Sequence, residues 1–269
     1  MKTAVVVGAN GFLGSALVNE LVLQNFEVIA VYHTNHNKIN KKAKLFTNEE
    51  LLASNLEPDF VFYLSGNYAN SHAKLLEIND ILYRYSLKFI HAKMVFVSST
   101  NVYGNPTSTV TENSPFNNPG LYAQSKLAGE FIVKVMSHYA IVRLAYLYGK
   151  GITNSSFVPA IIASAKENKK ITLFGQGERE QDYVYIDDAV SLCIACALKE
   201  ANDIYLGATG ISVSNKHVSE EIQKHIECEI VFQGEENGQS FYFNPKQTFE
   251  KLNWQPKTTI SEGIKKMLA

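Results

Sequence analysis

The chain has 269 residues, of which 46% are apolar and 19% are charged, and its formal net charge at pH 7 is −1. A globular chain of this length holds one large α/β domain, or a large and a small domain packed together, and the composition excludes intrinsic disorder. The near-neutral charge excludes a general attraction to nucleic acid or to an anionic membrane surface.

In the first half of the chain, short runs rich in β-branched residues alternate with longer amphipathic stretches. The runs that predict strands are Thr3–Val7, Glu27–Tyr32, Leu45–Phe46, Asp59–Leu64, Met94–Ser98 and Ala140–Leu147. The stretches that predict helices are Gly11–Asn25, Glu49–Leu56, His72–His91 and Tyr122–Ser137. Strands separated by helices form βαβ units, so we expect an α/β fold with a doubly wound parallel sheet covered on both faces.

After Gly149 this alternation ends, and we expect a smaller C-terminal lobe. The elements predicted there are helices at Phe157–Lys166, Ala189–Leu198 and Val218–Ile226, strands at Lys170–Phe174 and Glu229–Phe232, and a terminal helix. Cys193 and Cys196 are interpreted as small residues on the packed face of a helix. With three cysteines in the chain we expect no metal site and a reducing, cytoplasmic location. No run approaches the ~18–20 apolar residues of a membrane-spanning helix, so we expect no membrane partner.

Three glycines, Gly8, Gly11 and Gly14, lie between the first predicted strand and the first predicted helix. Here Gly8 allows a sharp turn, Gly11 lets the backbone approach a pyrophosphate, and Gly14 lets the helix lie close to the sheet. The helix N-terminus offers free N–H groups to the phosphates. A glycine-rich turn without a ligand is the alternative, but the position at the start of a βαβ unit favours a dinucleotide site in a Rossmann-type fold. The residues assigned to this site are Gly8, Asn10, Gly11, Phe12, Leu13 and Gly14.

This assignment divides the chain by expected function. We expect a dinucleotide-binding domain at 1–150, completed by about 184–208, and a smaller substrate-binding lobe at 151–183 and 209–269. The second predicted strand ends at Tyr32 and is followed by His33, Thr34 and Asn35. An acidic residue here would bond the ribose hydroxyls of NAD, whereas this segment, together with Lys38, suits a 2′-phosphate. We therefore favour NADP over NAD; a polar loop without influence on selectivity is the alternative.

Tyr122 and Lys126 lie four residues apart, and hence on one face of a predicted helix. A nearby cation favours the phenolate and lowers the pKa of a tyrosine, as a general acid–base at a carbonyl or alcohol requires. The spacing also occurs at Tyr146 and Lys150, but that pair runs from a strand end into glycines and would not share a helical face. The pattern therefore favours Tyr122 and Lys126 as the proton-transfer pair.

Hydroxyl side chains end the strand at Met94–Ser98, where Ser98, Ser99 and Thr100 follow one another. Open α/β sheets bind ligands at the carboxyl ends of their strands, so a hydroxyl here can hold a substrate oxygen in line with Tyr122. Serines that only form a turn are the alternative.

Taken together, these motifs resemble those of the extended short-chain dehydrogenase/reductase family, often called the NAD-dependent epimerase/dehydratase family. The matching features occur in the family's order over almost the whole chain. They are Gly8–Gly14, Pro58–Leu64, Asn79, Ser98–Gly104, Tyr122–Lys126, Arg143–Gly149, Gln181–Asp188, Tyr205–Gly207, Leu252–Lys257 and Glu262–Ile264.

The resemblance implies a role for each matching residue. Ser99 would position the substrate and Tyr122 would be the acid–base. Tyr122 and Lys126 would also contact the cofactor, Lys126 through the nicotinamide ribose. Asn79 resembles the family's helix-kink asparagine. Further cofactor contacts are expected at His33, Leu64 and Ser65, and substrate contacts at Asn67, Thr100, Asn101, Tyr146 and Arg179. Members often form homodimers by pairing two long helices, here His72–His91 and Tyr122–Ser137.

Many members act on a nucleotide-activated sugar held between the lobes, often for polysaccharide biosynthesis. The family's dehydratases carry an Asp-Glu pair where this chain has Thr100 and Asn101, so dehydration is not expected. We favour reduction of a 4-keto-6-deoxyhexose over 4-epimerisation with retained NAD. The family's usual arginine before Asp182 is Gln181 here, so either Arg179 takes its place or the substrate is not a nucleotide sugar. A dinucleotide-sensing protein without turnover is the remaining alternative, and the intact Ser99, Tyr122 and Lys126 argue against it.

Overall fold

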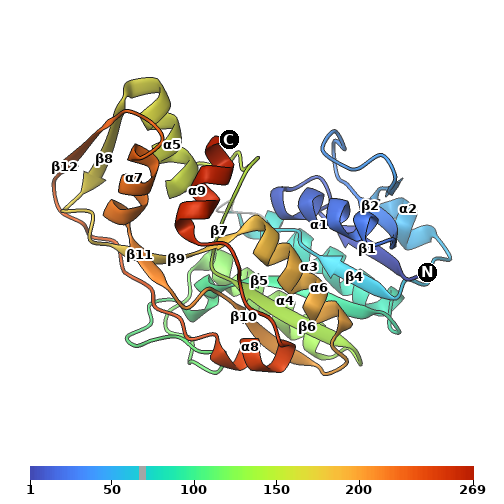
Figure 1. Ribbon diagram of the computed structural model, residues 1–269. Coiled ribbons are helices and arrows are strands. Elements are labelled where there is room, and N and C mark those ends of the chain that lie inside the picture. Colours follow the sequence, from blue (N-terminus) through green and yellow to red (C-terminus); the bar gives the residue numbers. More distant parts are fainter. Residues whose placement is uncertain (67–70) are drawn as a thin grey trace.

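The larger part of the molecule is one parallel β-sheet. The computed structural model describes residues 1–66 and 71–269. Within these ranges the sheet has seven strands, in the order β10-β6-β5-β4-β1-β2-β3 (Figure 1). Their bounds are β1 (Thr3–Val7), β2 (Glu27–Val31), β3 (Lys44–Phe46), β4 (Phe60–Tyr63), β5 (Lys93–Ser99), β6 (Tyr139–Leu144) and β10 (Asp203–Gly207). The order reverses between β1 and β4, and ligands bind at such a switch point in doubly wound sheets. The predicted Rossmann-type fold is confirmed.

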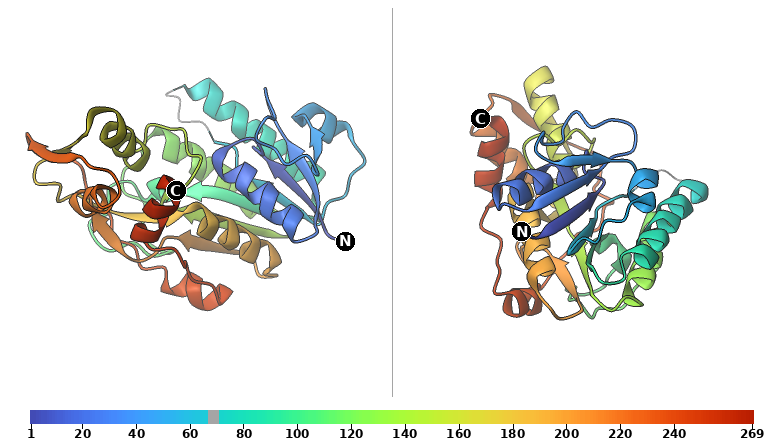
Figure 2. Two further views of the ribbon diagram at one scale, coloured as in Figure 1. Left: turned by 45° about the horizontal axis from the view of Figure 1, so that its top comes forward. Right: turned by 90° about the vertical axis from the view of Figure 1, so that its right-hand side faces the viewer.

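Helices cover both faces of this sheet (Figure 2). Alternate residues of β1 belong to two separate apolar clusters: Ala4 and Val6 pack beside α1 (Phe12–Leu23) and α6 (Ile186–Leu198). Val5 and Val7 pack beside the other helical layer, whose members are α2 (Asn48–Ala53), α3 (His72–Lys88) and α4 (Leu121–Lys134). Because each strand is buried on both sides, the strands are continuous apolar runs instead of alternating ones.

The C-terminal lobe is built on two smaller sheets. One has the order β11-β9-β7 and the other pairs β12 with β8. The bounds are β7 (Tyr146–Tyr148), β8 (Lys170–Phe174), β9 (Glu180–Tyr185), β11 (Ser212–Ser214) and β12 (Glu229–Gln233). The helices of this part are α5 (Phe157–Asn168), α7 (Asn215–Gln223), α8 (Lys246–Leu252) and α9 (Ile260–Leu268). In the described ranges, no helix is both long and apolar enough to cross a bilayer.

The predicted strand Ala140–Leu147 is divided in the structure. β6 ends at Leu144, and β7 leaves the large sheet to pair with β9 of the smaller one. The division falls at Ala145, whose N–H donates to the Gly207 carbonyl at 2.8 Å. The run contains no glycine, proline or turn-forming residue, so the sequence has no signal for this change of sheet.

Candidate active site

The glycine loop joins β1 to α1 in the conformation that its residues require. Gly8 has a φ of +83°, which favours glycine, and a side chain at Gly14 would collide with the Gly8 carbonyl. Gly11 is the N-cap of α1 and has no side chain to occupy the helix terminus. Leu13 packs into the apolar core, so only its backbone faces the loop. The residues present therefore fit a pyrophosphate: the first turn of a twelve-residue helix offers its N–H groups beside a loop without obstructing side chains.

Asn10 holds the segment that follows β2 against this loop. Its side-chain amide donates to the Asn35 side-chain oxygen and its own side-chain oxygen accepts the Lys38 N–H at 2.9 Å. His33 is exposed at the beginning of the segment. Residues 32–38 contain no carboxylate; their polar side chains are amides, imidazoles, hydroxyls and one lysine.

Lys126 is buried between the carboxyl ends of β4 and β5. Its ammonium donates to the Val97 carbonyl at 2.9 Å and to the Ser65 carbonyl at 3.2 Å. Burial lowers the pKa of Lys126 to about 8, and the negative charge of Glu130 opposes this effect. The ammonium is thus held by neutral dipoles at the edge of the sheet where ligands are expected.

Tyr122 lies one helical turn before Lys126, and the centroid of its ring is 5.9 Å from the Lys126 Nζ. A Cβ built on Gly66 would lie 3.3 Å from that Nζ and 4.0 Å from the Tyr122 hydroxyl. The two polar groups therefore converge on the backbone that follows β4. Ser65 connects them to the glycine loop, because a Cβ on Gly8 would lie 3.1 Å from the Ser65 Oγ. Leu64, just before it, donates its N–H to the Val7 carbonyl at 3.0 Å.

The predicted hydroxyl residues at the end of β5 have different surroundings. Ser98 is buried and donates to the Glu130 carboxylate at 2.7 Å. Ser99 is partly exposed and accepts the Asn101 N–H at 3.2 Å, so it caps the short helix η1 (Thr100–Tyr103). Of the two serines, Ser99 is the one that is partly open to solvent, together with Thr100 and Asn101.

Asn79 links α3 to α4 directly beside Lys126. Its side-chain amide donates to the Leu75 carbonyl at 3.2 Å and to the Ser125 carbonyl at 3.1 Å. Asn79, Ser125, Lys126 and Tyr122 all line one small pocket with Ser65 and Gly66. The sequence motifs at these positions, far apart in the chain, are therefore neighbours in space.

The other predicted substrate contacts lie in the C-terminal lobe or outside the described residues. Tyr146 is 41% exposed, and the centroid of its ring lies 5.7 Å from that of Tyr183. Burial raises the pKa of Tyr183, and the positive charge of Arg179 opposes this effect. Arg179 donates its Nε to the Gln239 carbonyl at 3.1 Å. Gln181 is 2% exposed, and its side-chain oxygen has no hydrogen bond within the described part of the chain. Asn67 lies outside the described residues.

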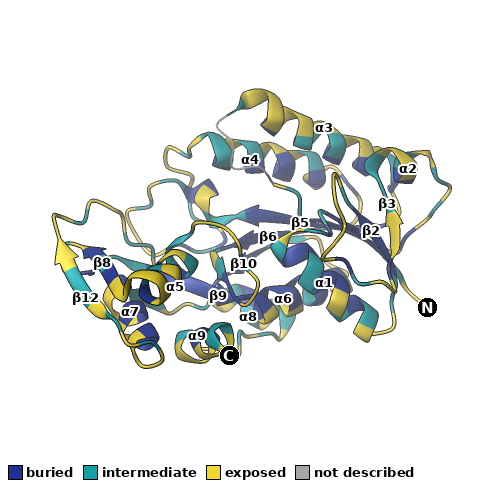
Figure 3. Ribbon diagram, turned by 90° about the horizontal axis from the view of Figure 1, so that it is seen from above, coloured by how far each residue is buried: buried dark blue, intermediate teal, exposed yellow. Residues whose placement is uncertain are grey.

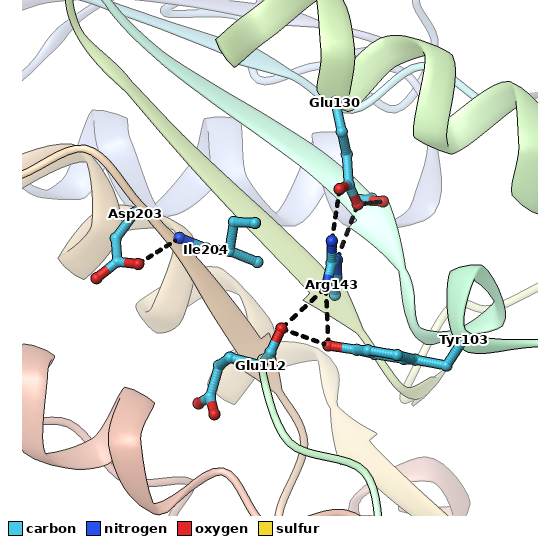
Figure 4. A network of polar contacts seen from close by, with 7 residues as sticks. Tyr103, Glu112, Glu130, Arg143, Asp203 and Ile204 are labelled. Carbon is cyan, nitrogen blue, oxygen red and sulfur yellow. Dashed lines mark hydrogen bonds and ion pairs between the residues drawn. The ribbon is translucent and has the colours of Figure 1, made fainter. Parts of the chain in front are cut away.

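A buried ion pair on the same helix as Tyr122 and Lys126 was not predicted from the sequence. Glu130 follows Lys126 by four residues on α4 and binds the guanidinium of Arg143 through both carboxylate oxygens. Arg143 also donates to the Tyr103 hydroxyl at 2.9 Å (Figure 4). The spacing Tyr122, Lys126, Glu130 on one helical face was the available signal.

Comparisons with known proteins identify the family and the fold. The family described as "NAD dependent epimerase/dehydratase family" matches residues 4–206. A putative UDP-glucose 4-epimerase of Methanocaldococcus jannaschii is 30% identical over 98% of this chain and 96% of its own length. A dTDP-4-dehydro-6-deoxyglucose reductase of Escherichia coli is 22% identical over 98% of this chain and 95% of its own. The crystal structure of the Thermotoga maritima UDP-glucose 4-epimerase with UDP-glucose has a TM-score of 0.87 at 22% identity, covering 99% of this chain and 97% of that one.

Proposed function

The chain belongs to the NAD-dependent epimerase/dehydratase family, and from this we propose that it transfers a hydride between a nicotinamide dinucleotide and a carbon of a nucleotide-activated sugar. The observation that carries the proposal is the convergence of the Tyr122 hydroxyl and the Lys126 ammonium on Gly66, beside the glycine loop. A proton donor and a dinucleotide site at one edge of a parallel sheet are the two parts that such a reaction requires.

In the proposed mechanism, Tyr122 exchanges the proton of the reacting hydroxyl. A dinucleotide held on Gly8, Gly11 and Gly14 would supply or accept the hydride. During reduction the phenol gives its proton to the carbonyl oxygen, and during oxidation the phenolate takes it from the alcohol. Lys126 favours the phenolate electrostatically, and its contacts with the Ser65 and Val97 carbonyls hold the ammonium in place. Ser99 holds the substrate oxygen by a hydrogen bond.

For the cofactor we favour NADP over NAD, with its pyrophosphate on Gly8, Gly11 and Gly14. The exposed segment after β2 carries His33, Asn35 and Lys38 and no carboxylate to bond the ribose hydroxyls. Asn10 holds this segment against the glycine loop, where the adenosine end of a dinucleotide lies in folds of this type.

For the reaction we favour reduction of a 4-keto-6-deoxyhexose. Thr100 and Asn101 cannot act as acid or base at neutral pH, which argues against dehydration. A reductase uses up one reduced cofactor in each turnover, and the preference for NADP over a retained NAD therefore favours reduction. The second candidate is 4-epimerisation with retained NAD, and the 30% identity to a putative UDP-glucose 4-epimerase favours it.

For the substrate we assign the sugar to Thr100 and Asn101 and the nucleotide to Tyr146 and Arg179, within a substrate lobe formed by 151–183 and 209–269. A glutamine at 181 has no charge for a diphosphate. Arg179 precedes β9 by one residue, and its positive charge acts to lower the pKa of Tyr183. Tyr183 is paired with Tyr146 on the neighbouring strand, so the two side chains share one face of the sheet. We therefore assign to Arg179 the charge that Gln181 lacks.

We also propose a homodimer, formed through the outer faces of α3 and α4. These helices lie side by side (Figure 3). They expose large apolar side chains at Leu76, Tyr83 and Leu87 on α3 and at Phe131 and Val135 on or beside α4, all at least 50% exposed. An apolar stripe of this kind marks a protein interface. Phe131→Asp should convert a dimer into a monomer in analytical ultracentrifugation; a wild-type monomer at micromolar concentration would contradict the proposal.

The test begins with the purified protein. Denaturation and chromatography identify any retained nucleotide, and the absorbance at 340 nm then follows NADPH in the presence of a dTDP-linked 4-keto-6-deoxyhexose. Oxidation that requires the nucleotide sugar supports the reductase, whereas retained NAD with interconversion of UDP-glucose and UDP-galactose supports the epimerase. Oxidation with simple ketones but with no sugar nucleotide would overturn the substrate class.

A further inference from the structure

Arg143 is the centre of a buried polar network that the proposed reaction does not itself use. It is 2% exposed, and its Nε and Nη2 donate to the two carboxylate oxygens of Glu130 at 2.9 and 2.7 Å (Figure 4). Its Nη1 donates to the Tyr103 hydroxyl at 2.9 Å and to the Glu112 carbonyl at 3.1 Å. The planar fork of the guanidinium thus fixes three other segments of the chain at defined angles.

Each partner of Arg143 lies on a segment that carries a proposed catalytic residue or leads to one. Glu130 is on α4, one turn after Lys126, and it also accepts the hydroxyl of Ser98, the residue before Ser99. Tyr103 ends η1, which Ser99 caps. The ion pair therefore joins the helix of the phenol and ammonium to the strand end of the third proposed catalytic residue.

The network continues into the C-terminal part of the chain. The Glu112 carboxylate accepts the N–H and the hydroxyl of Thr248, at 3.0 and 2.6 Å, and Thr248 in turn accepts the N–H of Leu206. The loop between η1 and α4 is consequently held at Glu112 from both sides, by Arg143 on its carbonyl and by α8 on its carboxylate. This loop leads directly into the helix of Tyr122.

We propose that Arg143, acting through Glu130, is a positioning residue for hydride and proton transfer: it holds Ser99 on β5 in register with Tyr122 and Lys126 on α4. The inference rests on the proposed function. A buried ion pair contributes little net stability compared with apolar residues of similar volume, because its desolvation offsets the attraction. What it adds is a defined geometry, and a misplacement of about 1 Å in a catalytic site costs on the order of 10²-fold in rate.

Three variants separate positioning from charge neutralisation. Arg143→Met leaves the Glu130 carboxylate buried without its cation, and we expect a large loss of thermal stability. In the double variant Arg143→Met/Glu130→Gln the ion pair is removed as a whole, and the amide oxygen still accepts from Ser98. Because the Glu130 charge also raises the pKa of Lys126, a variant that keeps this charge is needed beside it. Arg143→Lys keeps the charge but loses the fork. The matched control is Lys93→Met, which removes a buried cation that donates to the Glu200 and Ala201 carbonyls from the opposite end of β5.

The expected result is that stability and turnover separate. The double variant should regain most of the thermal stability lost in Arg143→Met, while its kcat stays at least about tenfold below wild type and its dissociation constant for the dinucleotide stays within about twofold. Arg143→Lys should show the same fall in kcat, and Lys93→Met should keep the wild-type kcat per folded molecule. A double variant or an Arg143→Lys variant with wild-type kcat would overturn the proposal.

Hydrogen–deuterium exchange provides a readout that does not depend on turnover. Backbone amides of residues 98–104 and 120–126 should exchange faster in the double variant than in the wild type and in Lys93→Met. Unchanged exchange in both segments would overturn the positioning role. If the wild type turns over no nucleotide sugar, the proposed function fails. The exchange measurement still decides whether Arg143 and Glu130 hold the two segments in place.

Discussion

The two halves of the candidate site differ in how their polar groups are satisfied. Beside the large sheet, the Lys126 ammonium has two backbone carbonyls, and Ser98 and Arg143 share the Glu130 carboxylate. In the C-terminal lobe, the side-chain oxygen of Gln181 and the hydroxyl of Tyr183 are buried without a hydrogen bond to any described residue. Each such group costs roughly 1–3 kcal/mol. Around Lys126 and Arg143 the polar groups are therefore paired, although the large sheet also buries the Tyr205 hydroxyl on β10 without a described partner, whereas the half that we assign to recognition retains Gln181 and Tyr183 without one.

The largest expected effect comes from the reaction half. Tyr122→Phe removes the hydroxyl that would exchange the proton and should lower kcat by about 10²–10⁴-fold. Binding of the dinucleotide, measured by fluorescence quenching, should be unchanged, since the glycine loop is untouched. Wild-type turnover in the Tyr122→Phe variant would contradict the assignment of this half of the site to the reaction.

The difference between the halves also explains what the sequence could reveal. The glycine loop and the pair Tyr122–Lys126 are local patterns whose spacing is meaningful only on a strand-turn-helix or on one helical face, so they could be located before the fold was known. Glu130 is local too, but its partner Arg143 lies on another strand, and only packing connects them. The resemblance assigns the substrate hydroxyl to Ser99, and the contact of Ser98 with the Glu130 carboxylate joins two distant segments that no local pattern connects.

The C-terminal lobe was less predictable for a physical reason. All of its strands except β9 lie at sheet edges, β11 spans only Ser212–Ser214, and the central β9 begins among charged and polar residues. Which side chains share a face there depends on pairings such as Tyr146 with Tyr183, more than 30 residues apart, and no local periodicity encodes such a pairing. The residues that decide the substrate were consequently the least certain to place from sequence.

A second substitution sharpens the comparison from the recognition side. Arg179→Met removes a charge that we assign to the nucleotide diphosphate, and KM for the nucleotide sugar should rise about tenfold or more with kcat nearly unchanged. The matched control is Lys170→Met on β8, which removes an exposed cation of the same lobe. A fall in kcat without a change in KM would place Arg179 with the reaction half and contradict the assignment.

The smallest expected effect is a pH dependence of stability that the reaction half contributes. Burial holds the pKa of Lys126 at about 8 in the folded chain, below its ordinary value of 10.5, so between these values the unfolded chain binds more protons at this site. The contribution of Lys126 to the free energy of unfolding therefore rises with pH across that window, by an amount that corresponds to at most one proton. Other groups also make stability depend on pH in this range, buried tyrosines among them, because burial raises their pKa above that in the unfolded chain. The quantity to measure is therefore the difference between wild type and Lys126→Met in urea unfolding from pH 7.5 to 10.5. This difference should shift in favour of the wild type as the pH rises.

The control Lys246→Met, which removes a side chain 77% exposed on α8, should follow the wild-type curve. A difference that does not change with pH would mean that Lys126 keeps an ordinary affinity for its proton in the folded chain, and would contradict the effect of burial on its pKa.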